Sequence, residues 1–235
     1  MSPELVDSME LELAGKCDRV FATAESLAKR LETVNDHTAF IPNGANFERF
    51  VQASWNLPCP KDMQEISKPI FGFVGALQAC IEYGFVKAAA QAHPEWSFVF
   101  IGREKPGVDL SELRAMENCH FLGLKPNESL PDYICQFDAC LNLFDSSPLS
   151  KDVSPLKFYE YLATGKPVIS TPQPDQILQF ASIIQIAHNA QEFIKCCQDA
   201  LQDKNAAARI EEGRKSSWDA RVTQMLEILE HDGVF

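Results

Sequence analysis

Several features that mark other classes of protein are missing from this sequence. No apolar run is long enough to span a bilayer, and the first residues carry acids instead of a basic start with an apolar core. We therefore expect neither a membrane span nor a signal peptide, and we predict a cytoplasmic protein. Basic residues are scarce, because 21 lysines and arginines stand against 33 acidic residues. The net charge of -12 repels nucleic-acid phosphates, so we expect no nucleic acid among its partners.

Motifs that would hold a metal or a cofactor are missing as well. The eight cysteines contain no Cys-x-x-Cys pair and the five histidines are scattered, so we expect reduced thiols and no zinc site. The sequence contains no Asp-x-Asp pair, no Walker loop and no Gly-x-Gly-x-x-Gly fingerprint. These absences predict a protein without a metal or a resident cofactor. A small anion could still bind where backbone amides converge.

The sequence instead shows a regular alternation of short apolar strands and helices. Residues 70–75 and 97–102 are continuous apolar runs that end in glycine, which is typical of strands buried on both faces. A final helix is predicted over residues 206–229. Further strands are predicted at residues 119–123, 139–144, 167–170 and 183–186. The alternation predicts an α/β fold with a Rossmann-like, doubly wound parallel sheet, in which ligands bind at the carboxyl ends of the strands.

Three of the predicted strands end in a glycine, which lets the backbone approach a ligand closely. Gly75 would place the start of the following helix against a phosphate, although a plain tight turn is equally compatible with it. Arg103 follows the second strand and could grip a diphosphate with its planar fork of donors, or could lie in solvent beside Glu104. Gly123 ends the third strand and leaves room for a flat ring against the backbone.

The segment between Ser147 and Ser170 is the most informative one. It leads into a predicted helix that starts near Pro155, a residue suited to the first helical turn. Lys157 lies in that turn, where a cation is unfavourable beside the helix dipole, so a bound anion would account for it. Glu160 follows on the same side of the helix, and its carboxylate can accept hydrogen bonds from two neighbouring hydroxyls, as on a ribose. A surface ion pair between Lys157 and Glu160 is the alternative.

This segment resembles the signature of group 1 glycosyltransferases with the GT-B fold. The resemblance rests on residues 155–170, which read PLKFYEYLATGKPVIS. Residues 41–50, IPNGANFERF, are similar to the junction between the two domains of that family. Shorter segments also match in chain order, at residues 73–77, 100–102, 130–134 with 137–144, and 217–221. The resemblance covers nearly the whole chain and implies the carboxyl-terminal, donor-binding domain of such an enzyme.

The family's residue roles are carried over position by position. Glu160 would bind the ribose of a nucleoside-diphosphate sugar, and the backbone at residues 155–157 would form the diphosphate-binding turn. Lys157 would stabilise the leaving diphosphate, where negative charge builds up in the transition state. Asp152 lies where the family usually has a glutamate that faces the sugar. The resemblance therefore implies Lys157 and Asp152 as catalytic residues, with no need for a metal.

The base and the phosphates of the donor are assigned in the same way. Gly123 and Leu124 match the site that frames the base, and Gly75 matches a loop near the phosphates. The loop after Gly75 reads ALQAC, where the family often has an arginine and a lysine. Together these comparisons imply seven donor-binding residues: Gly75, Arg103, Gly123, Leu124, Pro155, Leu156 and Glu160.

The resemblance also divides the chain into two parts. Residues 1–45 would be a remnant of the amino-terminal acceptor domain with the linker, and residues 46–235 the donor-binding domain. The acceptor domain would be a partner, and apolar surface from Leu11 to Leu31 would favour self-association. The implied enzyme is a hexosyltransferase-like transferase, incomplete as this isolated chain, that uses a nucleoside-diphosphate sugar and an unknown acceptor. A non-catalytic nucleotide-sugar-binding module or subunit is the alternative, and a related epimerase or hydrolase would need an internal acid or base.

Overall fold

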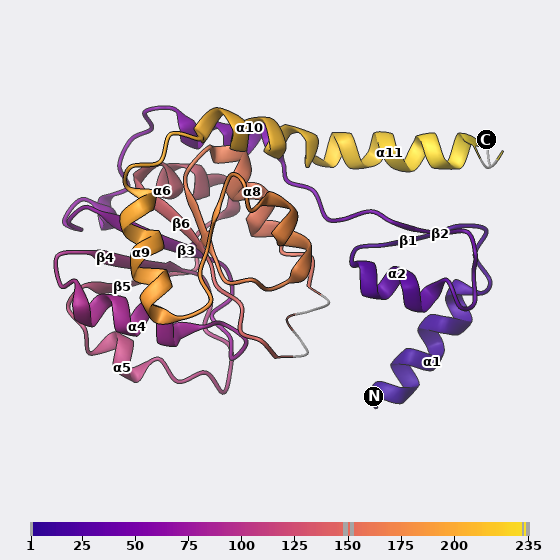
Figure 1. Ribbon diagram of the computed structural model, residues 1–235, viewed down its shortest axis with the longest axis horizontal. Coiled ribbons are helices and arrows are strands. Elements are labelled where there is room, and N and C mark those ends of the chain that lie inside the picture. The colour runs from indigo at the N-terminus through magenta and orange to yellow at the C-terminus, as the bar shows by residue number, and fades with distance from the viewer. Residues whose placement is uncertain (1, 148–149, 151–152, 232, 234–235) are drawn as a thin grey trace.

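A six-stranded parallel sheet forms the centre of the main body of the protein (Figure 1). The computed structural model describes residues 2–147, 150, 153–231 and 233. The strand order is β5-β4-β3-β6-β7-β8, so the direction of strand addition reverses between β3 and β6. This is the predicted doubly wound arrangement, and the fold class is confirmed. The strands are β3 (Ile70–Val74), β4 (Ser97–Ile101), β5 (Cys119–Gly123), β6 (Ala139–Asn142), β7 (Val168–Ser170) and β8 (Gln185–Ile186).

Helices cover both faces of this sheet (Figure 1). Alternate residues of β3 point to opposite sides, because Ile70 and Val74 belong to one buried cluster and Phe71 and Phe73 to the other. Both faces of the sheet are therefore core, as the continuous apolar runs predict. The flanking helices are α3 (Phe47–Phe50), α4 (Tyr83–Ala92), α5 (Ser111–Arg114), α6 (Leu130–Gln136), α8 (Leu156–Thr164), α9 (Ala190–Ala200) and α10 (Ala206–Lys215), with short 3-10 helices η1 (Val51–Ser54), η2 (Lys61–Met63), η3 (Asn127–Ser129) and η4 (Asp175–Phe180). Within the described residues, no helix combines the length and apolarity needed to cross a membrane.

A smaller unit precedes the main sheet and is joined to it by a linker (Figure 1). It consists of two parallel strands and two helices around a small cluster that includes Ala28 and Leu31. The apolar surface that we expect between Leu11 and Leu31 is thus largely internal. The exposed apolar side chains of this unit lie mainly on its first helix, at Leu5, Val6, Met9 and Leu13, and self-association stays a prediction. The elements are α1 (Pro3–Ala14), β1 (Val20–Ala22), α2 (Glu25–Leu31) and β2 (Thr38–Phe40).

The carboxyl-terminal helix differs from the sequence prediction. The single helix expected over residues 206–229 is two helices, α10 and α11 (Trp218–His231). The linker crosses the chain at the break, where the Ala45 amide donates to the Ser216 carbonyl at 2.9 Å. The Ala45 carbonyl accepts from the first amide of α11 at 3.0 Å. The Ser217 hydroxyl adds a local cap, because it accepts from the Ala220 amide at 3.1 Å.

Arg209 stabilises the carboxyl end of α8 through hydrogen bonds to backbone carbonyls and an ion pair. Its guanidinium is fully buried and donates through Nε and Nη2 to the Gly165 carbonyl, each at 3.1 Å. It also donates to the Ile183 carbonyl at 2.9 Å and forms a buried ion pair with Asp203. Since the last carbonyls of a helix lack partners within the helix, Arg209 satisfies backbone groups that would otherwise be orphaned.

Candidate functional site

The carboxyl ends of β3, β4 and β5 lie side by side, and their glycines form a tight backbone arrangement. The Gly75 amide donates to the Ile101 carbonyl at 2.8 Å, and the Gly102 amide donates to the Gly123 carbonyl at 2.9 Å. Gly75 and Gly102 have φ of 145° and 150°, where side chains are strained. A Cβ on Gly102 would lie 1.9 Å from the Gly75 carbonyl oxygen. The close approach of these two loops therefore depends on glycine.

A cleft of about 440 Å³ opens beside these strand ends. It is lined by Gly75, Arg103 and Leu124, so the structure brings three of the predicted donor-binding residues to one place. Leu124 is 65% exposed although it is apolar, as expected of a residue that contacts a ligand. Glu104 pairs with Arg114, and Arg103 lines the cleft as an exposed residue.

Lys157 projects from the first turn of α8 toward the end of β3. Its ammonium lies 4.4 Å from the centroid of the Phe73 ring and 5.4 Å from that of Phe144. A Cβ on Gly75 would lie only 2.4 Å from Lys157 Nζ, so this nitrogen rests against the glycine backbone. Burial lowers the pKa of the Lys157 ammonium to about 8. The protein thus holds a poorly hydrated cation at the switch point of the sheet.

Glu160 lies one helical turn beyond Lys157. Burial raises the pKa of its carboxyl to about 7, although the charges of Lys157 and Arg49 partly oppose this. The ion pairs among the described residues do not include one between Lys157 and Glu160. The alternative of an exposed surface pair is wrong, because both groups are partly withdrawn from water. Sequence reasoning missed Arg49, although it lies in the segment that resembles the interdomain junction.

Tyr161 connects α8 directly to the end of β3. Its buried hydroxyl accepts a hydrogen bond from the Val74 amide at 2.7 Å. β6 pairs with β3 only at Phe71 and Gly72, so the tyrosine takes the place of a strand partner at Val74. This bond fixes the strand end immediately before Gly75, four residues along the helix from Lys157. The sequence alone did not indicate this contact, because the Val74 amide lies far from Tyr161 along the chain.

Hydrogen bonds from Asn43 in the linker also stabilise the segment just before α8. Ser154 accepts from the Asn43 amide through its hydroxyl at 3.0 Å and from the Asn43 side chain through its carbonyl at 2.9 Å. In the described part of the chain, no side chain caps the first turn of α8, which starts after Pro155. The amides of a first helical turn lack partners within the helix, so this turn can donate to an anion. Leu156, at its first position, is 42% exposed.

Two further predictions concern Asp152 and metals. Asp152 lies outside the described residues, and its predicted role facing the sugar stays a prediction. Across the residues that the structure describes, no three His, Cys, Asp or Glu side chains gather in a way that could hold a metal ion. The chemistry that the described site offers is therefore that of a buried ammonium, helix amides and a carboxylate.

Comparison with known proteins decides the family. A model of glycosyl transferases group 1 matches residues 68–203, which is more than half of the chain. The chain belongs to the group 1 glycosyltransferases. The family suggested by residues 155–170 is thereby confirmed, and the matched region contains every predicted site residue.

Individual relatives agree with this assignment. The putative teichuronic acid biosynthesis glycosyltransferase TuaH of Bacillus subtilis is 27% identical over 177 residues, which are 73% of this chain and 44% of TuaH. The chain thus spans less than half the length of this curated relative. Anabaena HepE in complex with UDP superposes with a TM-score of 0.73 at 15% identity, covering 98% of this chain and 70% of HepE. Sucrose-phosphate synthase from Thermosynechococcus elongatus superposes with a TM-score of 0.67 at 20% identity, covering 100% of this chain and 63% of the synthase. At these identities the two structures show a shared fold.

Proposed function

We propose that this group 1 glycosyltransferase binds a nucleoside-diphosphate sugar between the end of β3 and the start of α8. The observation that carries the proposal is the buried Lys157 ammonium, which rests against Gly75 beside the uncapped first turn of α8. A cation with a depressed pKa at a helix start is costly unless an anion completes the site. A diphosphate supplies negative groups that both an ammonium and the amides of a helix start can bind. The HepE structures that contain UDP, one of them with glucose, support this ligand class.

Each part of the donor then has a matching group. The diphosphate meets Lys157 and the backbone after Pro155, and the ribose hydroxyls meet the Glu160 carboxylate. The base lies in the cleft against Leu124, next to Gly123, and Arg103, which also lines the cleft, reaches the phosphates. During transfer, negative charge grows on the leaving diphosphate, and fixed donors stabilise it without a metal. Leu156 contributes its amide, and Gly75 brings the end of β3 against the Lys157 ammonium.

The acceptor completes the proposed reaction. The family resemblance assigns it to an amino-terminal domain, to which we propose that residues 1–45 belong together with the linker. The name of TuaH, a putative teichuronic acid biosynthesis glycosyltransferase, supports a product of the teichuronic acid class. A non-catalytic binding module is the second candidate, and the loop after Gly75 favours it because it lacks the family's usual cations. Sugar transfer by the full-length protein distinguishes the two.

Binding of UDP to the 235-residue chain tests the donor site. A ligand specific to the folded state stabilises it by about 2.7 kcal/mol at 100 times its Kd, so the melting temperature should rise with UDP concentration. Uridine, which lacks the diphosphate, serves as the control and should give a much smaller rise. If UDP, GDP and ADP all leave the melting temperature unchanged, the proposal is wrong.

The pH dependence of UDP binding adds a sharper test. Lys157 has a pKa of about 8, so its ammonium is charged below pH 8. Glu160 has a pKa of about 7, so its carboxylate is ionised above pH 7. The affinity for UDP should therefore be highest between pH 7 and pH 8. It should decrease at lower pH, because Glu160 is protonated, and at higher pH, because Lys157 loses its proton. Calorimetric titration from pH 6 to pH 9 measures this, and Glu160→Gln should flatten only the acid side.

Replacing Gly102 by alanine tests the close packing of the two loops. The new Cβ would collide with the Gly75 carbonyl, so the two loops must separate and the packing of Gly75 against Lys157 is disturbed. We expect a loss of roughly 1–3 kcal/mol of stability and roughly 10-fold in UDP affinity, measured by melting and calorimetry. Gly107→Ala is the matched control, because Gly107 has a φ of 87° but nothing within 4 Å of its Cβ position. Equal effects at both positions would show that backbone strain alone is responsible.

A further inference from the structure

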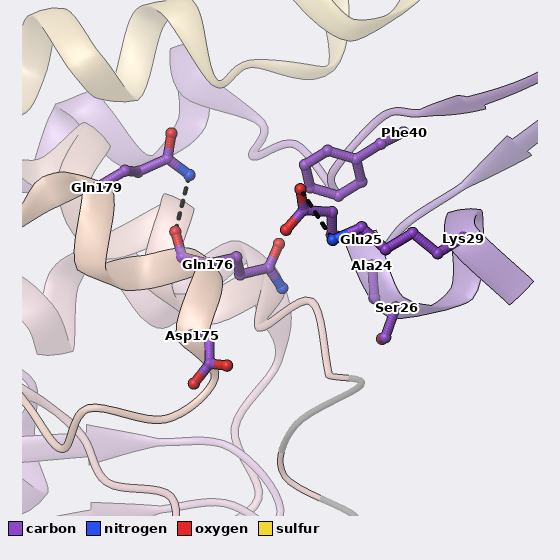
Figure 2. Close-up of a pocket in the computed structure, with 8 residues that line it drawn as sticks. All are labelled: Ala24, Glu25, Ser26, Lys29, Phe40, Asp175, Gln176 and Gln179. Carbon is purple, nitrogen blue, oxygen red and sulfur yellow. Dashed lines mark hydrogen bonds and ion pairs between the residues drawn. The ribbon is translucent and has the colours of Figure 1, made fainter.

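The charged side chains that line the cleft beside β3, β4 and β5 are all basic, although the protein as a whole is acidic. They are Arg103, Lys105 and Lys125, and none of the described residues that line the cleft is an aspartate or a glutamate. The cavity of about 550 Å³ between α2 and η4 differs, because its wall carries two carboxylates as well as a lysine (Figure 2). The cleft therefore presents positively charged donors and suits a ligand group that accepts hydrogen bonds.

Lys125 is held in place by two residues from other elements. Its ammonium lies 2.6 Å from the Asp62 carboxylate and 5.4 Å from the centroid of the Tyr133 ring. The Tyr133 hydroxyl donates to the same carboxylate at 3.0 Å. The hydrogen bond to Asp62 raises the pKa of the Lys125 ammonium, so this group is charged at neutral pH. Only 20% of the Lys125 side chain is exposed, whereas Arg103 and Lys105 are exposed loop residues.

The strand order places Lys125 far from the proposed phosphate site. Lys125 follows β5, and Gly75, against which the Lys157 ammonium rests, follows β3. Since β4 lies between these strands and neighbouring strands are about 4.8 Å apart, the two ends of the cleft are roughly 10 Å apart. A nucleoside diphosphate with its phosphates at Lys157 thus extends its base toward Lys125. The edge of the base that is opposite the ribose then reaches the ammonium.

This edge differs among the bases in a way that an ammonium can distinguish. Uracil and guanine carry a carbonyl oxygen there, and cytosine and adenine carry an amino group at the equivalent position. An ammonium has three donors and no acceptor, so it binds the carbonyl oxygen but opposes the amino group with a second donor. Asn127 also lines the cleft, but its amide can turn to donate or to accept and therefore does not discriminate.

From these features we infer that the Lys125 ammonium, held by Asp62, donates to a carbonyl oxygen of the base and makes the site selective for uridine and guanosine diphosphates over cytidine and adenosine diphosphates. The inference rests on the proposed function and adds to it the class of base. Lys125 contacts the ligand, and Asp62 is a positioning residue that keeps the ammonium at the cleft wall. Because Asp62 lies in η2, base selection depends on a segment that precedes the sheet.

Calorimetric titration of the 235-residue chain with UDP, CDP, GDP and ADP tests this inference. UDP and CDP share the ribose and the diphosphate, so the ratio of their dissociation constants reports on the base alone. We expect UDP to bind roughly 10- to 100-fold more tightly than CDP, because CDP replaces a hydrogen bond to a charged group by two opposed donors. GDP should bind more tightly than ADP for the same reason.

Three variants assign the preference to its residues. Lys125→Met should weaken UDP binding by roughly 10-fold and leave CDP binding little changed, so the preference is lost. Asp62→Asn should reduce the preference, because the ammonium loses its charged anchor. Lys105→Met is the matched control, because it removes an exposed cation from the same cleft. It should weaken UDP and CDP equally and keep their ratio, and melting curves of each variant report whether it is folded.

The outcomes separate this inference from the proposed donor site. Equal affinities of the wild type for UDP and CDP overturn the inference and leave the donor site intact. A preference that Lys125→Met retains, or that Lys105→Met abolishes, also overturns it. A preference for UDP over CDP without one for GDP over ADP supports the inference and narrows the base to uracil. If none of the four diphosphates binds, the donor site is contradicted and this inference with it. If Lys125→Met does not fold, the wild-type ratio and Asp62→Asn decide.

Discussion

Replacing Lys157 by methionine should weaken UDP binding by roughly 2–4 kcal/mol, or about 30- to 1000-fold. Methionine keeps much of the side-chain volume and packs against Phe73 and Phe144, but it removes the positive charge that faces the diphosphate. Isothermal calorimetry with UDP measures the loss. A variant that binds UDP as tightly as the wild type would contradict the role of this residue.

The same substitution should raise the stability of the unliganded protein. The folded pKa of Lys157 is depressed to about 8, so the fold disfavours the charged form at neutral pH. This penalty is present below that pH and disappears as pH rises toward the ordinary lysine value. Methionine removes it, so the melting temperature at pH 7 should increase while affinity falls. Lys195→Met, at an exposed lysine of α9, is the control and should change neither quantity.

Replacing Arg209 by methionine should cost about 3–5 kcal/mol of stability, because Asp203 would be left as an uncompensated buried charge. The carbonyls of Gly165 and Ile183 would also lose their donors. For a protein of this size the melting temperature should fall by roughly 6–20 °C. Urea unfolding followed by circular dichroism measures the free energy directly.

Two further variants make the Arg209 result interpretable. Adding Asp203→Leu removes the stranded carboxylate and should restore a large part of the lost stability. Arg214→Met, at an exposed arginine of the same helix that pairs with Glu211, should cost less than about 1 kcal/mol. If the Arg209 and Arg214 variants melt alike, the buried network does not stabilise the fold. In that case the carboxyl end of α8 is held by packing alone.

Much of the proposed donor site was visible in the sequence because its residues lie where strands end. Gly75, Arg103 and Leu124 come from three different strand ends, and parallel strands bring such ends to one edge. Lys157 and Glu160 were linked by helical spacing, which is a local property. Tyr161 was missed because its partner, the Val74 amide, is 87 residues away in the chain. Arg49 was missed because the carboxyl group that it influences, Glu160, belongs to another helix. The break at Ser216 was also missed, and there the backbone of Ala45 supplies hydrogen bonds from a distant segment.

The sequence by itself determined the order of strands and helices, the buried nature of the sheet and the segment that marks the family. These properties follow from the period of apolar residues and from glycine and proline positions, which act over a few residues. Only the tertiary structure decided that Lys157 rests on Gly75, that Glu160 is withdrawn from water and that Arg209 is fully buried. Burial and long-range hydrogen bonding depend on segments that meet only after the chain has folded, so no local pattern contains them.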